Sequence, residues 1–218
     1  YKMIDSWSKE HPLRKEFLDK VKGIGPILAS GLIAYLASER IFTIRGVLKV
    51  EGNKIIVKRK KEKEVIELKP YMKIIKNEGN EVTIFAPSVM EVAKNPSQLW
   101  KYLGLAPGQK KEKGKKANFN VKLKPLYWKI GESFRKTKGF GRKLFEEILK
   151  KTREKHSEWT KLHQIEHAKR VTVKIFLACL WAKFREMKNL PVTNPYSRDK
   201  LNHSKIITWQ DWIEEKKK

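Results

Sequence analysis

The sequence has one cysteine and no long uncharged apolar run. Cys179 stands alone among 218 residues, which argues against disulfides and against a zinc site built from several cysteines. Its place within the apolar stretch 171–182 predicts a small core residue in a protein kept under reducing conditions. That stretch is the most apolar of the chain, yet it is too short to span a membrane and contains Lys174. We predict neither a transmembrane segment nor a signal peptide.

Acidic residues are also scarce. Only four are aspartates, and the glutamates are scattered through Lys/Glu-rich segments such as KEKEV and FEEIL. A two-metal nuclease site needs carboxylates gathered at one place, and no such pattern is visible. The sequence therefore predicts no metal and no other cofactor.

This scarcity leaves a large excess of positive charge. The chain holds 50 Lys and Arg against 24 Asp and Glu, a formal net charge of +26. Lysine-rich proteins of hyperthermophiles gain Glu together with Lys and stay near neutral, which is not the pattern here. We expect a nucleic acid as partner, DNA first and RNA as the alternative, and an intracellular, nucleoid-associated location. No membrane partner is expected, and a homo-oligomer is left open.

The segment 17–36, FLDKVKGIGPILASGLIAYL, predicts a helix, a Gly-Ile-Gly hairpin and a second helix that begins at Pro26. Both glycines are expected to adopt backbone angles closed to other residues, and the isoleucine between them to plug the hairpin. The free N–H groups of the second helix suit one phosphate. This is a helix-hairpin-helix signature, and a tight turn without a ligand is the alternative. The predicted contact residues are Lys22, Gly23, Ile24 and Gly25.

We predict an α+β fold that is mainly helical, with a helix-hairpin-helix domain and an inserted small antiparallel β-meander. β-Branched residues crowd together between turn signals such as EGN and NEGN, which predicts four strands near 41–50, 54–60, 64–75 and 81–85. Later helices are expected at about 97–103, capped by Ser97, and at 124–135, 141–155 and 157–187. The predicted organisation is a helix-hairpin-helix segment (1–40), a β-module (41–86), a helical domain (87–190) with a basic loop at 108–118, and an irregular tail (191–218) with a short amphipathic piece.

Basic residues gather at three further places that could each lie on a phosphate backbone. These are the tip of a predicted β-hairpin, the 108–118 loop and a glycine-containing turn near residue 140. Tyr127 and Phe140 lie among basic residues and are candidates for stacking on bases. For the hairpin tip, a solvated turn or a blunted sheet edge is the alternative. The candidate contacts are Lys58, Arg59, Lys60, Lys110, Lys111, Lys113, Lys115, Lys116, Tyr127, Lys138, Arg142 and Lys143.

Three histidines are spaced along one predicted helix. His163 and His167 have the i, i+4 spacing used for transition metals, and His156 falls near the same face. No cysteine completes a ligand set, and Glu166 points to a different sector. We favour imidazoles on the helix surface or facing DNA, with a metal site as the alternative.

The order of these motifs resembles a known family. GIGPILASGLIAYL, then SQLWKYLGLAP, a Gly/Lys-rich loop and helices ending in VTVKIFLACLWAKFRE are similar to the C-terminal domain of IS one-ten family transposases, which are RNA-guided DNA recombinases. The resemblance covers residues 13–38 and 95–190. In that family a RuvC-like domain with acidic metal ligands comes first, and the helix-hairpin-helix domain supplies a serine nucleophile. The β-module would be an insertion relative to the family.

The resemblance also places a residue at the position of the nucleophile. An ungapped reading puts Asn120 where the family has its serine, and an amide cannot attack phosphorus. Ser133 would serve only with a shifted register. These features imply a transposase-like chain that binds DNA without strand chemistry of its own. Two alternatives stay open: an active recombinase or nuclease with catalytic residues in a missing N-terminal region, and an RNA-binding module.

Overall fold

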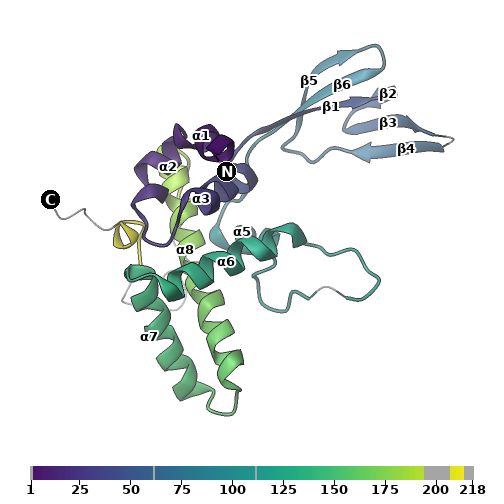
Figure 1. Ribbon diagram of the computed structural model, residues 1–218. Helices are drawn as coiled ribbons and strands as arrows, with labels where there is room; N and C mark the ends of the chain where they lie inside the picture. Colours follow the sequence, from purple (N-terminus) through teal and green to yellow (C-terminus); the bar gives the residue numbers. More distant parts are fainter. Residues whose placement is uncertain (1, 61, 111, 194–206, 214–218) are drawn as a thin grey trace. The chain divides into compact units, whose positions relative to one another are not determined.

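The computed structural model describes residues 2–60, 62–110, 112–193 and 207–213 (Figure 1). It confirms the predicted α+β class, mainly helical with small antiparallel sheets. The chain forms two compact units. The helical unit comprises residues 1–35 and 93–218, and the β-unit comprises residues 36–92. The β-unit therefore begins earlier and ends later than the 41–86 module.

The helical unit begins with four short helical elements. They are α1 (Lys2–Lys9), α2 (Pro12–Glu16), the 3-10 turn η1 (Leu18–Lys20) and α3 (Pro26–Leu32). Phe17 interrupts the first helix of the expected hairpin, because its backbone (φ −133°, ψ −63°) is not helical. α3 passes into a π-helical turn, η2 (Ile33–Ala37), which crosses the boundary between the units.

The second half of the helical unit follows the predicted helices closely. α5 (Pro96–Leu103) stops at Gly104, which has φ +72° as a left-handed C-cap requires. Its N-cap is Asn95 rather than the expected Ser97, because the Asn95 side chain accepts a hydrogen bond from the Gln98 N–H. α6 (Lys124–Lys136) follows the short turn η3 (Val121–Leu123).

Two long helices form an antiparallel hairpin (Figure 1). They are α7 (Phe140–Lys155) and α8 (Lys161–Met187), and they pack along each other. α8 begins four residues later than predicted because residues 156–160 form the turn between the two helices, and Thr160 caps α8 through the His163 N–H. In the described ranges, no helix is both long and apolar enough to cross a membrane.

The core of the helical unit is aromatic. Trp212, 1% exposed, lies in the 3-10 turn η4 (Gln210–Trp212) of the C-terminal segment. Its ring contacts Phe134 of α6, Phe140 of α7 and Phe176 of α8, each with a centroid distance of 5.1 Å. A bridge between Val21 and Ile213 also ties this segment to the hairpin turn. The described part of the predicted tail, residues 207–213, therefore contributes to the core.

The β-unit contains two three-stranded antiparallel sheets and the short helix α4 (Val89–Val92). One sheet has the order β1-β6-β5 and the other the order β2-β3-β4. Side chains from both sheets share one apolar core, with Ile44, Val82 and Ile84 from the first and Val47, Ile55 and Val57 from the second. The strands are β1 (Arg40–Arg45), β2 (Val47–Glu51), β3 (Lys54–Arg59), β4 (Glu62–Glu67), β5 (Lys73–Glu78) and β6 (Glu81–Ala86).

The prediction of four strands was therefore wrong in two places. The strand expected at 41–50 is divided at Gly46, whose φ of +75° bends the chain from one sheet into the other. The strand expected at 64–75 is divided around Pro70, which has no N–H to donate to a ladder. Both interruptions let six short strands cover one core from two sides.

Candidate nucleic-acid interface

The hairpin turn lies between η1 and α3. Gly23 has φ +94°, a left-handed conformation that favours glycine, and Ile24 is 6% exposed, so it plugs the hairpin as predicted. Pro26 is the first residue of α3, also as predicted. Gly25 was expected to need special angles, but its φ of −84° is open to other residues. An added Cβ at Gly25 would meet nothing within 4 Å, so this residue leaves the start of α3 open to solvent.

α6 holds the hairpin turn at two adjacent residues. The Ser133 hydroxyl donates a hydrogen bond to the Gly23 carbonyl oxygen at 2.6 Å. A Cβ added at Gly23 would lie 3.1 Å from the Phe134 ring, and one added at Gly141 would lie 2.7 Å from the same ring. The two glycines therefore let the hairpin turn and the start of α7 both contact Phe134. We call residues 22–25 and 136–143 the turn pair.

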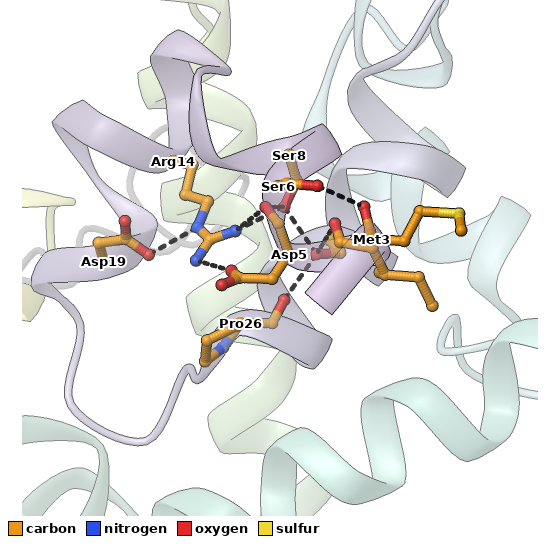
Figure 2. A network of polar contacts seen from close by, with 9 residues as sticks. Met3, Asp5, Ser6, Ser8, Arg14, Asp19 and Pro26 are labelled. Atoms are coloured by element: carbon orange, nitrogen blue, oxygen red, sulfur yellow. Dashed lines mark hydrogen bonds and ion pairs between the residues drawn. The ribbon is translucent and has the colours of Figure 1, made fainter. Parts of the chain in front are cut away.

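A polar network braces α1 against this hairpin (Figure 2). The buried Arg14 guanidinium lies 2.5 Å from Asp5 of α1 and 2.9 Å from Asp19 of η1. It also donates to the Ser8 hydroxyl, which lies 2.7 Å from the Ser30 hydroxyl of α3. Burial alone would lower the pKa of Arg14, but the hydrogen bonds to Asp19 and Asp5 raise it above its usual value. The network therefore joins four helical elements, α1, α2, η1 and α3, partly through charge-assisted hydrogen bonds.

The segment between α6 and α7 and the first turn of α7 supply further cations of the turn pair. Lys138 and Lys143 are exposed and make no ion pair within the described residues. Arg142, a predicted contact, instead pairs with Glu146 at 2.7 Å and donates to the Arg135 carbonyl oxygen at 3.1 Å. Phe140 was expected to be exposed, but its ring packs on Trp212. The structure therefore leaves the two lysines as the open cations here.

The basic loop is closed at its base by two contacts. The Phe119 ring lies under Gly104, where an added Cβ would come within 2.5 Å of it. Asn120 donates its amide to the Tyr102 hydroxyl at 3.0 Å and accepts from the Lys122 N–H at 3.1 Å. Four predicted contacts in the loop are exposed, and one of these, Lys115, pairs with Glu112 at 2.6 Å. These four are Lys110, Lys113, Lys115 and Lys116, whereas Lys111 lies outside the described residues.

Neither Ser133, the candidate nucleophile, nor Asn120, which stands at the expected position of a nucleophile, has a free side chain. Both polar atoms of the Asn120 amide are engaged at the base of the loop, and the Ser133 hydroxyl is engaged by the Gly23 carbonyl oxygen. Cys179 is buried, and burial raises the pKa of its thiol to about 12. Each of these side chains has a structural contact that accounts for its position.

The third basic segment belongs to the β-unit. Lys58, Arg59 and Lys60 are exposed at the turn between β3 and β4, and Arg59 pairs with Glu64 at 2.9 Å. Residues 36–92 contain 12 Lys and Arg and eight Glu, a net charge of +4. The remaining +22 of the chain's +26 belongs to the helical unit. The positive charge is therefore concentrated in the unit that holds the turn pair.

The three histidines do not lie on one continuous helix, because the turn 156–160 separates α7 from α8. They surround Trp159 instead. The Trp159 ring is stacked between His156, at 3.9 Å, and His163, at 4.1 Å, while the His167 ring meets its edge. An indole between two imidazoles keeps them from binding one metal ion, and the described residues contain no group of three ligands suited to a metal.

This stack lines a groove that the sequence analysis did not identify. The groove has a volume of about 470 Å³ and lies between α6 and α8. Tyr127, a predicted contact, lines it from α6 and is half-buried, which raises the pKa of its hydroxyl. The residues missed were Trp128, Trp159 and Arg170. Because residues 156–160 form a turn between two helices, no regular spacing in the sequence indicates this stack.

The chain matches no protein-family model, no curated protein and no solved structure.

Proposed function

We propose that this chain binds DNA through backbone phosphates, largely independently of base sequence, and that the turn pair is its main contact. The observation that carries the proposal is the shared contact of Gly23 and Gly141 with Phe134. This contact holds the start of α3 and the start of α7 against one ring. Neither N-cap glycine, Gly25 or Gly139, makes a side-chain cap hydrogen bond, and helix starts of this kind favour anions. Lys138 and Lys143 add positive charge near the start of α7.

The distribution of charge supports the same function. The helical unit carries +22, and the 108–118 loop of this unit holds four exposed lysines in addition to those of the turn pair. Such fields attract polyanions over a Debye length and give binding that depends on salt. As a further part of the proposal, the order of motifs supports a relationship between this chain and the C-terminal domain of IS one-ten family transposases.

We propose binding without cleavage by this chain. The engaged side chains of Asn120 and Ser133 and the buried thiol of Cys179 support this part of the proposal, because none of them is available to attack a phosphodiester. The test is incubation with labelled duplex, junction and single-stranded DNA in Mg²⁺ or Mn²⁺. We expect retarded complexes and neither cleaved strands nor covalent adducts. A metal-dependent nick that is lost in Ser133→Ala would contradict the proposal.

The binding itself is tested by fluorescence anisotropy with a blunt duplex at several salt concentrations. If about six to ten phosphates are neutralised, affinity is expected to fall by about 10³ to 10⁵ between 50 and 200 mM salt. The double variant Lys138→Gln/Lys143→Gln removes two charges from the turn pair and is expected to reduce the salt slope by about 2.

Lys63→Gln/Lys73→Gln is the matched control, because it removes the same charge from the β-unit at two exposed lysines that are not among the candidate contacts. We expect the control to bind nearly as tightly as the unaltered protein. Equal losses in the two variants would remove the turn pair from the proposed contact. A nearly flat salt response of the unaltered protein would reject phosphate binding as a whole.

A further inference from the structure

The groove between α6 and α8 is lined by two rings of a stack, Trp159 and His163, and His156 adds a third ring on the other face of Trp159. Trp159 lies 4.1 Å from His163 with an angle of 7° between the rings, and 3.9 Å from His156 with an angle of 8°. These three rings form a fixed platform across the turn between α7 and α8. His163 is exposed and forms one end of this stack within the groove, so a further planar ring can add to it at the same spacing.

A second aromatic surface lies in the same groove. Trp128 of α6 is 53% exposed, although exposing so large an apolar ring to water is unfavourable. Lys169 lies over this ring at 4.9 Å and also contacts Glu132 and Glu166, so its charge is already compensated. Lys169, whose charge is balanced by the two glutamates, therefore holds Trp128 at the groove, and the ring keeps a large exposed area.

The groove also holds an uncompensated cation. Arg170 of α8 is exposed, lines the groove and makes no hydrogen bond or ion pair with any described residue. Its charge acts on its neighbours, since the pKa of His167 is lowered first by burial and then by Arg170. A guanidinium in this position can bind a phosphate with two parallel hydrogen bonds.

We infer that this groove binds an unpaired nucleobase, stacked on Trp128 beside the His163 end of the platform, with an adjacent phosphate held by Arg170. The inference rests on the proposed nucleic-acid binding and adds a substrate class to it, namely strands with a flipped, bulged or single-stranded nucleotide. Paired bases already have both faces covered within the duplex, so only an unpaired base offers a free face to these rings. A cation beside exposed aromatic rings matches the chemistry of a nucleotide, which joins a planar ring to a phosphate.

The test compares two duplexes that differ only in one central bulged nucleotide, each prepared as DNA and as RNA. Anisotropy titrations are expected to show tighter binding of the bulged form by about 5- to 100-fold, the range for one base stacked on an aromatic side chain. The DNA and RNA arms show which sugar the groove accepts, because the inferred stacking is common to both. Quenching of tryptophan fluorescence by the bulged form alone is expected as an independent signal of stacking.

Matched variants separate the groove from the rest of the surface. Trp128→Ala is expected to abolish the preference for the bulge while leaving binding of the blunt duplex within about twofold. Trp7→Ala is the control, because Trp7 of α1 is 56% exposed and lies outside the groove. Arg170→Gln is likewise compared with Arg153→Gln, an exposed arginine of α7 that does not line the groove.

The outcomes distinguish the two proposals. If the unaltered protein binds blunt and bulged duplexes equally, or if Trp128→Ala keeps the preference, the groove inference is wrong while backbone binding stands. If the protein binds neither duplex at low salt, the proposed function itself fails. Circular dichroism of every variant excludes loss of fold as the cause of weaker binding.

Discussion

The Ser133 hydroxyl donates a 2.6 Å hydrogen bond to the Gly23 carbonyl oxygen across 110 positions of sequence. This contact joins α6 to the hairpin turn, and the neighbouring Phe134 ring contacts Gly23 and Gly141. A side chain that the family resemblance offered as a weak alternative nucleophile is therefore a brace of the proposed DNA contact. These contacts of Ser133 and Phe134 fix the position of α3 relative to α7. A phosphate held between the two helix starts would require such a fixed arrangement.

Ser133→Ala is expected to lower the free energy of unfolding by about 0.5–1.5 kcal/mol, because a half-buried carbonyl oxygen loses its hydrogen-bond donor. Urea unfolding followed by circular dichroism measures this change. The control is Ser6→Ala, since the exposed Ser6 hydroxyl bonds only the Met3 carbonyl oxygen one turn away in α1. A Ser133→Ala protein as stable as the control would show that the contact adds nothing to the hairpin.

The two hairpin glycines are expected to respond differently. Gly23→Ala forces a side chain into a left-handed conformation beside Phe134, which is expected to cost about 1–2 kcal/mol of stability. Gly25→Val meets no steric obstacle, so the fold should remain, but its branched side chain covers the start of α3. We expect at least about tenfold weaker binding to duplex DNA by anisotropy. Unchanged affinity of a folded Gly25→Val protein would remove the hairpin from the interface.

The Arg14 network is expected to depend on the planar shape of the guanidinium and not only on its positive charge. Arg14→Lys keeps the positive charge but replaces a planar fork with one ammonium, which cannot hold Asp5, Asp19 and Ser8 in the same arrangement. Because both carboxylates are partly exposed, water screens part of the attraction that is lost. We expect the free energy of unfolding, measured in urea, to fall by about 1–3 kcal/mol. Arg45→Lys is the matched control, since the Arg45–Glu81 pair is exposed and should change stability by less than about 0.5 kcal/mol. Equal effects of the two substitutions would mean that the network stabilises the hairpin no more than a surface pair.

Local signals in the sequence were sufficient for two of the helix boundaries. Pro26 and Gly104 mark helix boundaries by backbone properties that do not depend on distant residues, and the structure confirms both. The division of the β-unit into two sheets was missed because the runs 41–50 and 64–75 each keep a β-like composition across a break. Only the shared core of the two sheets shows why the chain bends at Gly46.

The candidate site was less predictable because it depends on contacts between distant residues. The sequence indicated two glycine turns separately, but it gave no sign that Phe134 lies against both. Trp212 belonged to the short amphipathic piece of the predicted tail, but the sequence did not show that rings from three helices surround and bury it. The spacing of the histidines was noticed, yet Trp159 was not, since its stacking requires the turn at 156–160 that ends α7.

The thiol of Cys179 is expected to be unreactive in the folded protein. The side chain is 4% exposed, its Sγ lies 3.5 Å from the Ile207 carbonyl oxygen, and burial raises its pKa from 9.0 to about 12. With this pKa, only about one thiol in 10⁴ is ionised at pH 8. Because the thiolate is the reactive form, a chromogenic disulfide reagent should label the native chain very slowly. In concentrated guanidinium chloride the same reagent should label one thiol per chain.

The raised pKa of Cys179 also predicts how stability depends on pH. The folded state holds the thiol proton more tightly than the unfolded state, so this contribution to stability is present below about pH 9 and is lost as the pH rises toward 12. Trp212→Ala should loosen the segment at 207–213 that covers the thiol, and labelling at pH 8 should then be much faster. A thiol covered by this segment can react only when the segment opens. Rapid labelling of the unaltered protein at pH 8 would therefore show that the segment opens from the core in the native state.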